Sequence, residues 1–449
     1  MKERALFATK IGVVATTVGS AVGLGNIWRF PYETGTHGGG AFIIIYILCV
    51  FAIGIPVMCS EFVMGRSTHR NVRGAFKMLS PKGSWHWMSY LGIVASLMIL
   101  SFYSVVAGWT LEYLYQSVMG TFESNSAEDF TCQFNEFSMS PWRPVVWTLI
   151  FLGLNFIVLR RGVQKGIERL SNILMPLLFI ILIIFAVNSL LLPQAQKGLE
   201  FLFNPDFSKI TPKVVLGAMG QAFFSLSLGL SGLLTYSSYF SNDTPLVRSA
   251  VIVAVLDTAV AILAGIIIFP AVFSFGAEPT AGPKLVFEVL PNIFQQMPGA
   301  YIWSIMFFVL LFFASITSTI SMSEISIAFF MEEGKMSRNK ATTLNTGIAV
   351  IFGVLCALSF GVLSDCKILG KTLFEFFDYT SSNILLPLGG MAFSIFVGWF
   401  MNKKIVNSQL TNNGTITVRI MKVLLFCIRY VAPLAIGLIF LYGLDLIQF

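Results

Sequence analysis

The hydrophobic pattern of the chain consists of long apolar runs separated by short polar segments. A bilayer requires roughly 20 apolar residues per crossing helix, and several of the runs are longer than that, which implies tilted helices. The runs cover residues 10–33, 40–66, 86–118, 143–160, 166–191, 214–240, 246–276, 301–333, 340–362, 370–401 and 419–447. The pattern therefore predicts an all-α polytopic membrane protein with eleven transmembrane helices.

Two of these runs are interrupted by small and polar residues. Residues 19–26 read GSAVGLGN and residues 225–232 read SLSLGLSG. Each glycine lowers helix stability by about 1 kcal/mol relative to alanine, and a broken membrane helix leaves carbonyls that need partners. One such stretch is explained equally well by close helix packing through small residues. Two of them, each at the start of one half of the chain, favour a secondary transporter whose helices 1 and 6 are discontinuous.

The positions of the two interruptions divide the chain into repeats. We expect helices 1 to 5 in residues 1–191 and helices 6 to 10 in residues 192–402, with an inner loop and helix 11 in residues 403–449. Because five is an odd number, the second half starts on the opposite side of the membrane. This predicts a 5+5 inverted repeat.

Composition and charge narrow the class of protein. With 56% hydrophobic and 11% charged residues, the chain resembles no soluble globular protein, and β-barrels have much weaker hydropathy. The net charge is +7. In a membrane protein an excess of Lys and Arg usually lies in the cytoplasmic loops, so we do not interpret it as a nucleic-acid-binding surface and expect no nucleic-acid partner. Lys and Arg favour the side of the N-terminus by roughly three to one, which predicts a cytoplasmic N-terminus and an extracytoplasmic C-terminus. No nucleophile–base set, nucleotide motif or metal cluster indicates an enzyme.

Polar side chains inside the apolar runs are candidate ion ligands. A dehydrated monovalent cation needs five or six oxygens, and Asn26, Ser225, Thr317 and Ser318 could add side-chain oxygens to the carbonyls of a broken helix. Considered alone, Ser and Thr more often bond to carbonyls of their own helix. Their occurrence beside two broken helices favours the ion site.

Charged residues near the ends of the runs are candidate gates, because a charge inside a membrane is costly unless it is paired. Arg29 follows the first interruption, and Asp378 begins span ten toward the outside. We expect these two residues to form an outer gate. Arg4 and Glu332 lie on the inner side and could form an inner gate.

Three further residues have candidate roles inside the spans. We expect Glu61 to be structural, accepting hydrogen bonds from the unwound backbone of span one. Asp257 has no neighbouring base in its helix, so it is either a cation ligand or a proton carrier. Tyr103 could offer its hydroxyl to a substrate or could be an ordinary packed tyrosine.

Several ordered motifs resemble one known family. They are GSAVGLGNIWRFP at 19–31, GGGAF at 38–42, GIP at 54–56, MGR at 64–66 and GQAFFSLSLG at 220–229. These are very similar to motifs of the neurotransmitter:sodium symporter family, specifically its bacterial amino-acid transporters of the leucine-transporter (LeuT) fold. The eleven spans resemble a bacterial subgroup that includes a transporter of hydrophobic amino acids.

The resemblance implies two sodium sites and a set of gates. The first sodium would meet the substrate carboxylate together with Ala21, Asn26, Ser225 and Asp257. The second would be held by Gly19, Val22, Ala314, Thr317 and Ser318. Tyr103 and Phe224 would form a lid beneath Arg29 and Asp378, and inner closure would use Arg4, Tyr239 and Glu332.

The resemblance also implies a substrate site between the broken helices. The substrate carboxylate would meet the backbone of Leu24 and Gly25 and the hydroxyl of Tyr103. The whole site would comprise Ser20, Ala21, Gly23, Leu24, Gly25, Ile99, Tyr103, Phe224, Ser225, Ser227, Leu230 and Met322.

Two positions then suggest how this chain differs from other members of the family. Gly23 stands where monoamine transporters carry an aspartate, so the ligand should bring its own carboxylate. Asp257 replaces the usual asparagine, and its charge could substitute for the chloride that animal members bind near Tyr46, Gln221 and Ser225. We therefore expect no chloride requirement and a neutral hydrophobic amino acid, aliphatic or aromatic, as the substrate.

The resulting expectation is a sodium-coupled symporter in the inner membrane of a prokaryote. It would import hydrophobic L-amino acids by alternating access with two sodium ions per substrate. Two alternatives remain open at this point: a proton-coupled transporter that uses Asp257, and an amino-acid sensor that binds without transport. The oligomeric state is not indicated by the sequence.

Overall fold

The computed structural model describes residues 6–122, 126–276, 285–417 and 419–447. Within these residues, nine continuous helices are long and apolar enough to cross a membrane, and a tenth crossing is a bent pair of helices. The bent pair joins Lys10–Ala21 to Gly25–Thr36 at an angle of 55°. A second broken segment consists of α11 (Pro212–Ser225) and α12 (Gly232–Ser237). It is not among these ten crossings, so the total of eleven that the hydropathy pattern gives stays a prediction.

The first two spans alternate α-helix with short π-helical turns, and the third is a long α-helix preceded by a 3-10 turn. The first contains α1 (Lys10–Ala21), η1 (Gly25–Arg29) and α2 (Phe30–Thr36), and the second contains α3 (Gly40–Cys49), η2 (Val50–Gly54) and α4 (Ile55–Thr68). A surface helix, α5 (Val72–Leu79), leads through η3 (Ser84–Met88) to the long α6 (Ser89–Val118). Outside the spans, α7 (Ala127–Met139) starts at a capping box formed by Ser126 and Asp129.

The remaining spans pack around these. They comprise α8 (Arg143–Arg160), η4 (Val163–Glu168) with α9 (Arg169–Leu190), α13 (Leu246–Ser274), α15 (Ala300–Glu332), α16 (Arg338–Leu358), α17 (Leu373–Tyr379) with η7 (Thr380–Leu385), α18 (Leu386–Ile395) and η8 (Phe396–Phe400), and α20 (Met421–Phe426) with η9 (Cys427–Val431) and α21 (Ala432–Gly443). The connecting segments hold α10 (Ala195–Phe203), η5 (Phe207–Lys209), η6 (Leu285–Val289), α14 (Leu290–Gln295) and α19 (Lys403–Leu410).

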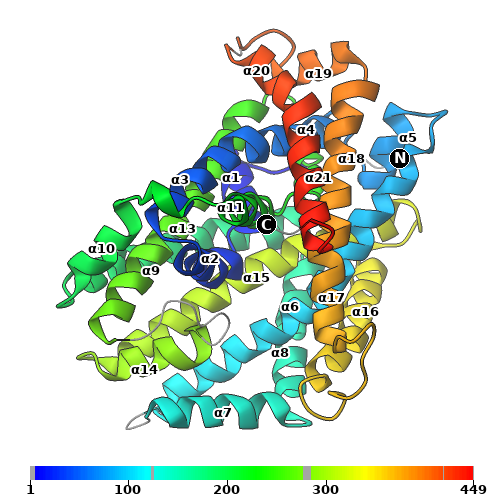
Figure 1. Ribbon diagram of the computed structural model, residues 1–449. Coiled ribbons are helices and arrows are strands. Elements are labelled where there is room, and N and C mark those ends of the chain that lie inside the picture. The colour runs from blue at the N-terminus through cyan, green and yellow to red at the C-terminus, as the bar shows by residue number, and fades with distance from the viewer. Residues whose placement is uncertain (1–5, 123–125, 277–284, 418, 448–449) are drawn as a thin grey trace.

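The two broken spans lie at the centre of the bundle (Figure 1). On one side of them are α9, α10 and α13, and on the other are α18 and α21, while α6 and α15 pack against each other. A hydrogen bond from Ser227 Oγ to the carbonyl of Ser20, at 3.3 Å, joins the two breaks directly. The breaks therefore face each other in the interior, which is where a ligand site between them must lie.

The second break is produced by an alternation of left-handed residues. Ser227, Gly229 and Ser231 have φ angles of 51°, 80° and 71°, so the chain cannot continue as a right-handed helix between α11 and α12. At Gly229 a side chain is also excluded by space, because a Cβ there would lie 2.2 Å from the carbonyl oxygen of Leu386. Gly229 thus allows α18 to approach the unwound backbone.

Glu61 is structural, but its partners differ from those that we expected. Its carboxylate is fully buried and accepts hydrogen bonds from the backbone of Gly229 at 2.9 Å and of Leu234 at 3.2 Å. Both partners belong to span six, so the expectation that Glu61 would serve the unwound backbone of span one is wrong. The reason is packing: α4 lies along α12, and the first break obtains its partners from Asn26 and Tyr103 instead.

This arrangement predicts the effect of neutralising Glu61. In Glu61→Gln one oxygen is replaced by an amide donor that faces a backbone N–H, and a charge-assisted hydrogen bond is lost. We expect a destabilisation of about 2 kcal/mol, measured as a lower unfolding temperature in detergent. The matched control is Ser60→Ala, because Ser60 is equally buried but bonds only to Pro56 of its own helix. Equal stability of the two variants would contradict the role of Glu61.

Candidate functional site

The predicted first sodium site is a connected polar group between the broken spans and α13. Asn26 Nδ2 donates to Ser225 Oγ at 3.0 Å and to Asp257 Oδ1 at 2.8 Å. Ser225 Oγ in turn donates to Asp257 Oδ2 at 2.7 Å. Ala21, the fourth predicted ligand, lines the same cavity as Asn26 and Ser225. The structure thus joins residues from three spans in one hydrogen-bonded group around a buried carboxylate. Ser225 and Asp257 contribute oxygens, the hard donors that an alkali cation prefers. Asn26 contributes its amide nitrogen here, and its oxygen accepts the N–H of Gly23.

The predicted second sodium site lies where α1 ends against α15. Ser318 Oγ donates to the carbonyl of Val22 at 3.0 Å, and a Cβ on Gly19 would lie 3.3 Å from the Cβ of Thr317. Thr317 Oγ1 bonds to carbonyls of its own helix, those of Phe313 at 2.9 Å and Ala314 at 3.2 Å. The Thr317 hydroxyl therefore makes the hydrogen bond to its own helix that is usual for threonine. The Ser318 hydroxyl makes a hydrogen bond to another span. The predicted ligands therefore come from the end of α1 and the facing turn of α15.

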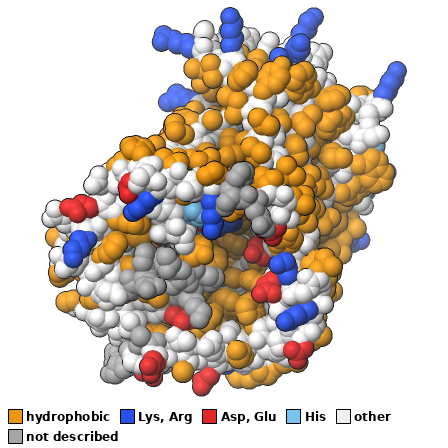
Figure 2. All heavy atoms as spheres, viewed as in Figure 1, with side chains coloured by type: hydrophobic (Ala, Val, Ile, Leu, Met, Phe, Trp, Pro, Cys, Tyr) orange, Lys and Arg blue, Asp and Glu red, His pale blue; other side chains and the backbone are white. Residues whose placement is uncertain are grey.

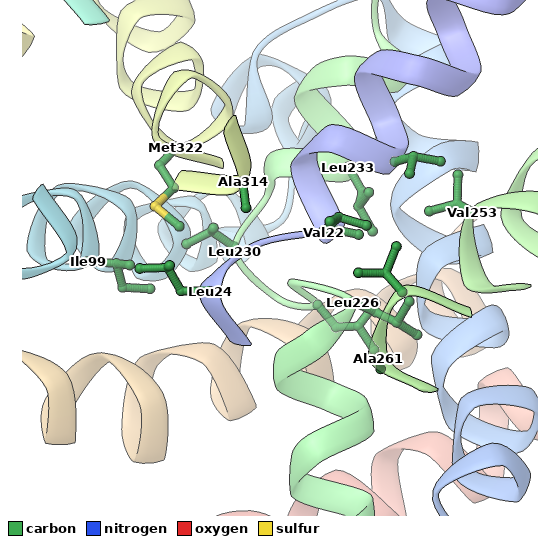
Figure 3. Close-up of a cluster of buried hydrophobic side chains, with 14 of the residues drawn as sticks. Val22, Leu24, Ile99, Leu226, Leu230, Leu233, Val253, Ala261, Ala314 and Met322 are labelled. Atoms are coloured by element: carbon green, nitrogen blue, oxygen red, sulfur yellow. The ribbon is translucent and has the colours of Figure 1, made fainter. Parts of the chain in front are cut away.

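The predicted substrate residues line a cavity of about 40 Å³ between these two groups. Ile99, Leu230 and Met322 form its apolar wall, and Figure 3 shows these side chains pointing toward one another near Leu24. Leu386 of α18 also lines the cavity, and our sequence reasoning did not include it. The full lining is Ala21, Gly23, Gly25, Asn26, Ile99, Tyr103, Phe224, Ser225, Ser227, Leu230, Ser318, Met322 and Leu386.

Two predicted substrate residues lie just outside this lining. Ser20 Oγ pairs with Ser321 Oγ at 2.5 Å, so its side chain is engaged between α1 and α15. Leu24 lines a second cavity above the first, and its backbone N–H donates to the hydroxyl of Tyr103 at 2.9 Å. Tyr103 is therefore held against the first break, as a residue that orients a carboxylate would be.

The predicted outer gate surrounds that second cavity, which measures about 330 Å³ and which we call the vestibule. It is lined by Leu24, Gly25, Trp28, Arg29, Tyr32, Glu33, Phe102, Tyr103, Val106, Phe224, Phe374, Asp378, Ser382 and Asn383. Phe224 lines both cavities, and the guanidinium carbon of Arg29 lies 4.2 Å from the centre of its ring. Phe224 therefore lies between the substrate cavity and Arg29, as the predicted lid beneath the gate would.

The predicted ion pair of the outer gate is not formed in this conformation. Among the described residues, no ion pair within 4.0 Å joins Arg29 to Asp378; Arg29 Nε instead lies 3.7 Å from Glu33 Oε1. Asp378 Oδ1 accepts a hydrogen bond from Ser382 Oγ at 3.0 Å. The two gate residues therefore face one vestibule without touching.

At the predicted inner gate the structure shows a network of polar contacts, of which only part was predicted. Arg4 lies outside the described residues. Tyr239 Oη donates to Glu324 Oε1 at 2.7 Å, and Arg338 Nη2 lies 2.7 Å from Glu324 Oε2. Glu332 accepts hydrogen bonds from the backbone and side chain of Asn71.

Sequence reasoning missed Glu324 and Arg338, although one signal was available. Glu324 is a carboxylate well inside an apolar run, which is the criterion that identified Glu61 and Asp257. Phe7 adds to the same closure, because its buried ring packs edge-on against Tyr236 and Tyr239.

Two broken spans that enclose a buried oxygen cluster, an apolar pocket and a vestibule define a polytopic membrane transporter. The sequence matches the sodium:neurotransmitter symporter family over residues 4–137 and 139–448. The chain belongs to this family, which confirms the resemblance and the prediction that the protein is a transporter and not an enzyme.

Individual relatives agree with this assignment. The chain is 39% identical to the uncharacterised sodium-dependent transporter YhdH of Bacillus subtilis, covering 99% of this chain and 98% of the relative. It is 37% identical to an uncharacterised sodium-dependent transporter of Haemophilus influenzae, covering 99% of each. The crystal structure of MhsT in complex with L-phenylalanine superposes with a TM-score of 0.90 at 42% identity, covering 98% of this chain and 100% of that one. The predicted LeuT fold is thereby confirmed.

The geometry around Gly23 yields a test of the site. A Cβ at Gly23 would lie 2.8 Å from Ser318 Oγ and 3.0 Å from the hydroxyl of Tyr103. Gly23→Ala should displace both, and overpacking on this scale typically destabilises a protein by about 1–3 kcal/mol, measured as a lower unfolding temperature in detergent. Gly220→Ala is the matched control, since nothing lies within 4 Å of a Cβ there. Equal unfolding temperatures for the two variants would contradict the assigned positions of Tyr103 and Ser318.

Proposed function

We propose that the protein is a sodium-coupled symporter that imports neutral hydrophobic L-amino acids. The observation that carries this proposal is the apolar pocket of Ile99, Leu230 and Met322 next to the group formed by Asn26, Ser225 and Asp257. The pocket suits an apolar side chain, and the polar group suits a cation that a substrate carboxylate would help to hold. The relative MhsT, whose complex contains L-phenylalanine, supports the same substrate class.

Gly23 supports a substrate that carries its own carboxylate. An acidic side chain at this position has no room, because even a Cβ meets Ser318 and Tyr103. A ligand carboxylate would bind the hydroxyl of Tyr103 and the backbone at Leu24 and Gly25, near the positive end of the helix that begins there. A zwitterionic amino acid meets these requirements, and a simple amine does not.

Two sodium ions per substrate would supply the driving force. We assign one to Ala21, Asn26, Ser225 and Asp257, and the other to Gly19, Val22, Ala314, Thr317 and Ser318. At a potential of about −100 mV and tenfold gradients, two ions release about 7 kcal/mol. For a substrate without net charge this sets a ceiling near 10⁵-fold accumulation.

The topology belongs to the same proposal. Figure 2 shows Lys and Arg side chains gathered at the end of the molecule formed by α5, α19 and α20, with acidic side chains toward α7. This asymmetry supports an inner membrane location with the N-terminus in the cytoplasm and the C-terminus outside. We further propose that residues 1–191 and 192–402 form inverted repeats, that residues 403–449 add the eleventh helix, and that the source is prokaryotic.

Uptake into proteoliposomes tests the transport proposal. We expect labelled hydrophobic amino acids to accumulate when an inward sodium gradient is imposed in chloride-free buffer, and to equilibrate without one. Accumulation driven by a proton gradient instead would transfer the coupling role to Asp257 as a proton carrier. Binding without accumulation would mean that the protein is a sensor, and either result would refute sodium symport.

Asp257→Asn tests the origin of the proposed chloride independence. Asp257 is fully buried and is held by Asn26 and Ser225, so removing its charge leaves the first sodium without a fixed counter-charge. We expect uptake to be lost, or to become dependent on added chloride. Asp243→Asn in the exposed loop before α13 is the control. Normal chloride-free uptake by Asp257→Asn would refute the role.

A further inference from the structure

Arg29 has a second carboxylate within reach, and this carboxylate is not the gate partner. Arg29 and Glu33 lie four residues apart on the same face of η1 and α2, with Arg29 Nε 3.7 Å from Glu33 Oε1. Asp378 approaches the same vestibule from α17. A guanidinium that is engaged with Glu33 is not available to Asp378, so the two carboxylates compete for one cation.

A third group acts on Glu33 from its other side. His37, one turn further along, has its Nδ1 3.3 Å from Glu33 Oε2 and 2.9 Å from the carbonyl oxygen of Glu33. Both of these oxygens are acceptors, so Nδ1 donates. Thr36 Oγ1, 3.0 Å from the same nitrogen, gives its own hydrogen to the carbonyls of Tyr32 and Glu33 and leaves Nδ1 as the donor. A further proton would therefore be taken up at Nε2. That nitrogen faces α11 at Gly217, where a Cβ would lie only 3.1 Å away, and the missing side chain leaves it room.

The surroundings keep this row of three charged groups partly shielded from water. The side chains of His37 and Glu33 are 13% and 17% exposed, and that of Arg29 is 33% exposed. The ring of His37 stacks on Phe42 with centroids 5.6 Å apart. Two lysines lie nearby. Lys213 of α11 repels a positive charge on His37, and the side chain of Lys209 lies against Gly38.

We propose that Glu33 is a positioning residue that holds the gate arginine away from Asp378, and that protonation of His37 releases this hold. When His37 is neutral, Glu33 attracts Arg29 and the vestibule stays open. When His37 is charged, it satisfies Glu33 and repels Arg29, which then pairs with Asp378 and closes the vestibule over the substrate pocket. This inference rests on the proposed transport function, in which the Arg29–Asp378 pair is the outer gate.

The sign of the pH dependence follows from this competition. The hydrogen bond to Glu33 raises the pKa of His37 above its ordinary value, so its charged form is favoured at higher pH than for a free imidazole. Closure of the vestibule should therefore increase as the pH falls through the range from about 8 to about 5 in which histidine titrates.

A cysteine reporter in the vestibule tests the proposal without requiring transport. Asn383→Cys places a thiol in the vestibule lining, in a chain whose exposed Cys132 and Cys366 are replaced. A parallel protein that retains Cys132 on the outer surface reports the intrinsic pH dependence of the thiol reaction. We measure the ratio of the two labelling rates in saturating sodium without substrate, and expect it to fall by about threefold at low pH, since partly exposed ion pairs shift equilibria by no more than about fivefold.

Two variants should abolish the pH response at opposite limits. In His37→Gln the side chain cannot acquire charge, so the ratio should stay at its high-pH value. In Glu33→Gln the competitor of Asp378 is lost, so the ratio should stay at its low-pH value. A purely structural role of either residue would not separate the two limits in this way.

The outcomes distinguish this inference from the proposed function. A ratio that does not change with pH in the protein with only the reporter substitution, or a common limit for the two variants, would overturn the positioning role. The pH dependence is first measured in the protein that carries only the reporter cysteine. This measurement can refute the proposal even if His37→Gln or Glu33→Gln fails to fold. A pH-dependent ratio together with a negative uptake assay would preserve the positioning role and refute symport, and the reverse pattern would do the opposite.

Discussion

The structure depends on one constraint: backbone groups released by a break inside a membrane must find partners within the protein. At the second break the buried carboxylate of Glu61 accepts the N–H groups of Gly229 and Leu234. At the first break the Asn26 side chain accepts the N–H of Gly23, and the Tyr103 hydroxyl accepts that of Leu24. An interrupted helix is stable here because side chains replace its lost hydrogen bonds. Asn26 does so from the broken span itself, and Tyr103 and Glu61 do so from neighbouring spans.

The same side chains are those to which we assign ligand binding. Asn26 stabilises the first break with its oxygen and reaches Ser225 and Asp257 with its nitrogen. Ser318 bonds to the carbonyl of Val22, at the end of α1. A cation at either place would engage the oxygens that now order the breaks, so ion binding and the conformation of the broken spans must be coupled.

The gates illustrate how a charge in a membrane protein can be shared between partners. Arg29 stacks on Phe224, lies near Glu33 and faces Asp378 across the vestibule. At the predicted inner gate, Glu324 is held by both Tyr239 and Arg338. Under the proposed transport function, an open vestibule at one end and a tightly bonded network at the other would be one state of an alternating-access cycle.

The sequence by itself determined the class of protein and the location of both breaks, because hydropathy and glycine content are local properties of the chain. Its motifs also identified the family and most of the residues that line the pocket. Only the tertiary structure decided the partners: that Glu61 serves the second break, that Leu386 lines the pocket, that Glu324 binds Arg338, and that Arg29 faces the vestibule without pairing with Asp378. Each of these depends on how spans distant in sequence pack and which rotamers they allow, and no local pattern encodes that information.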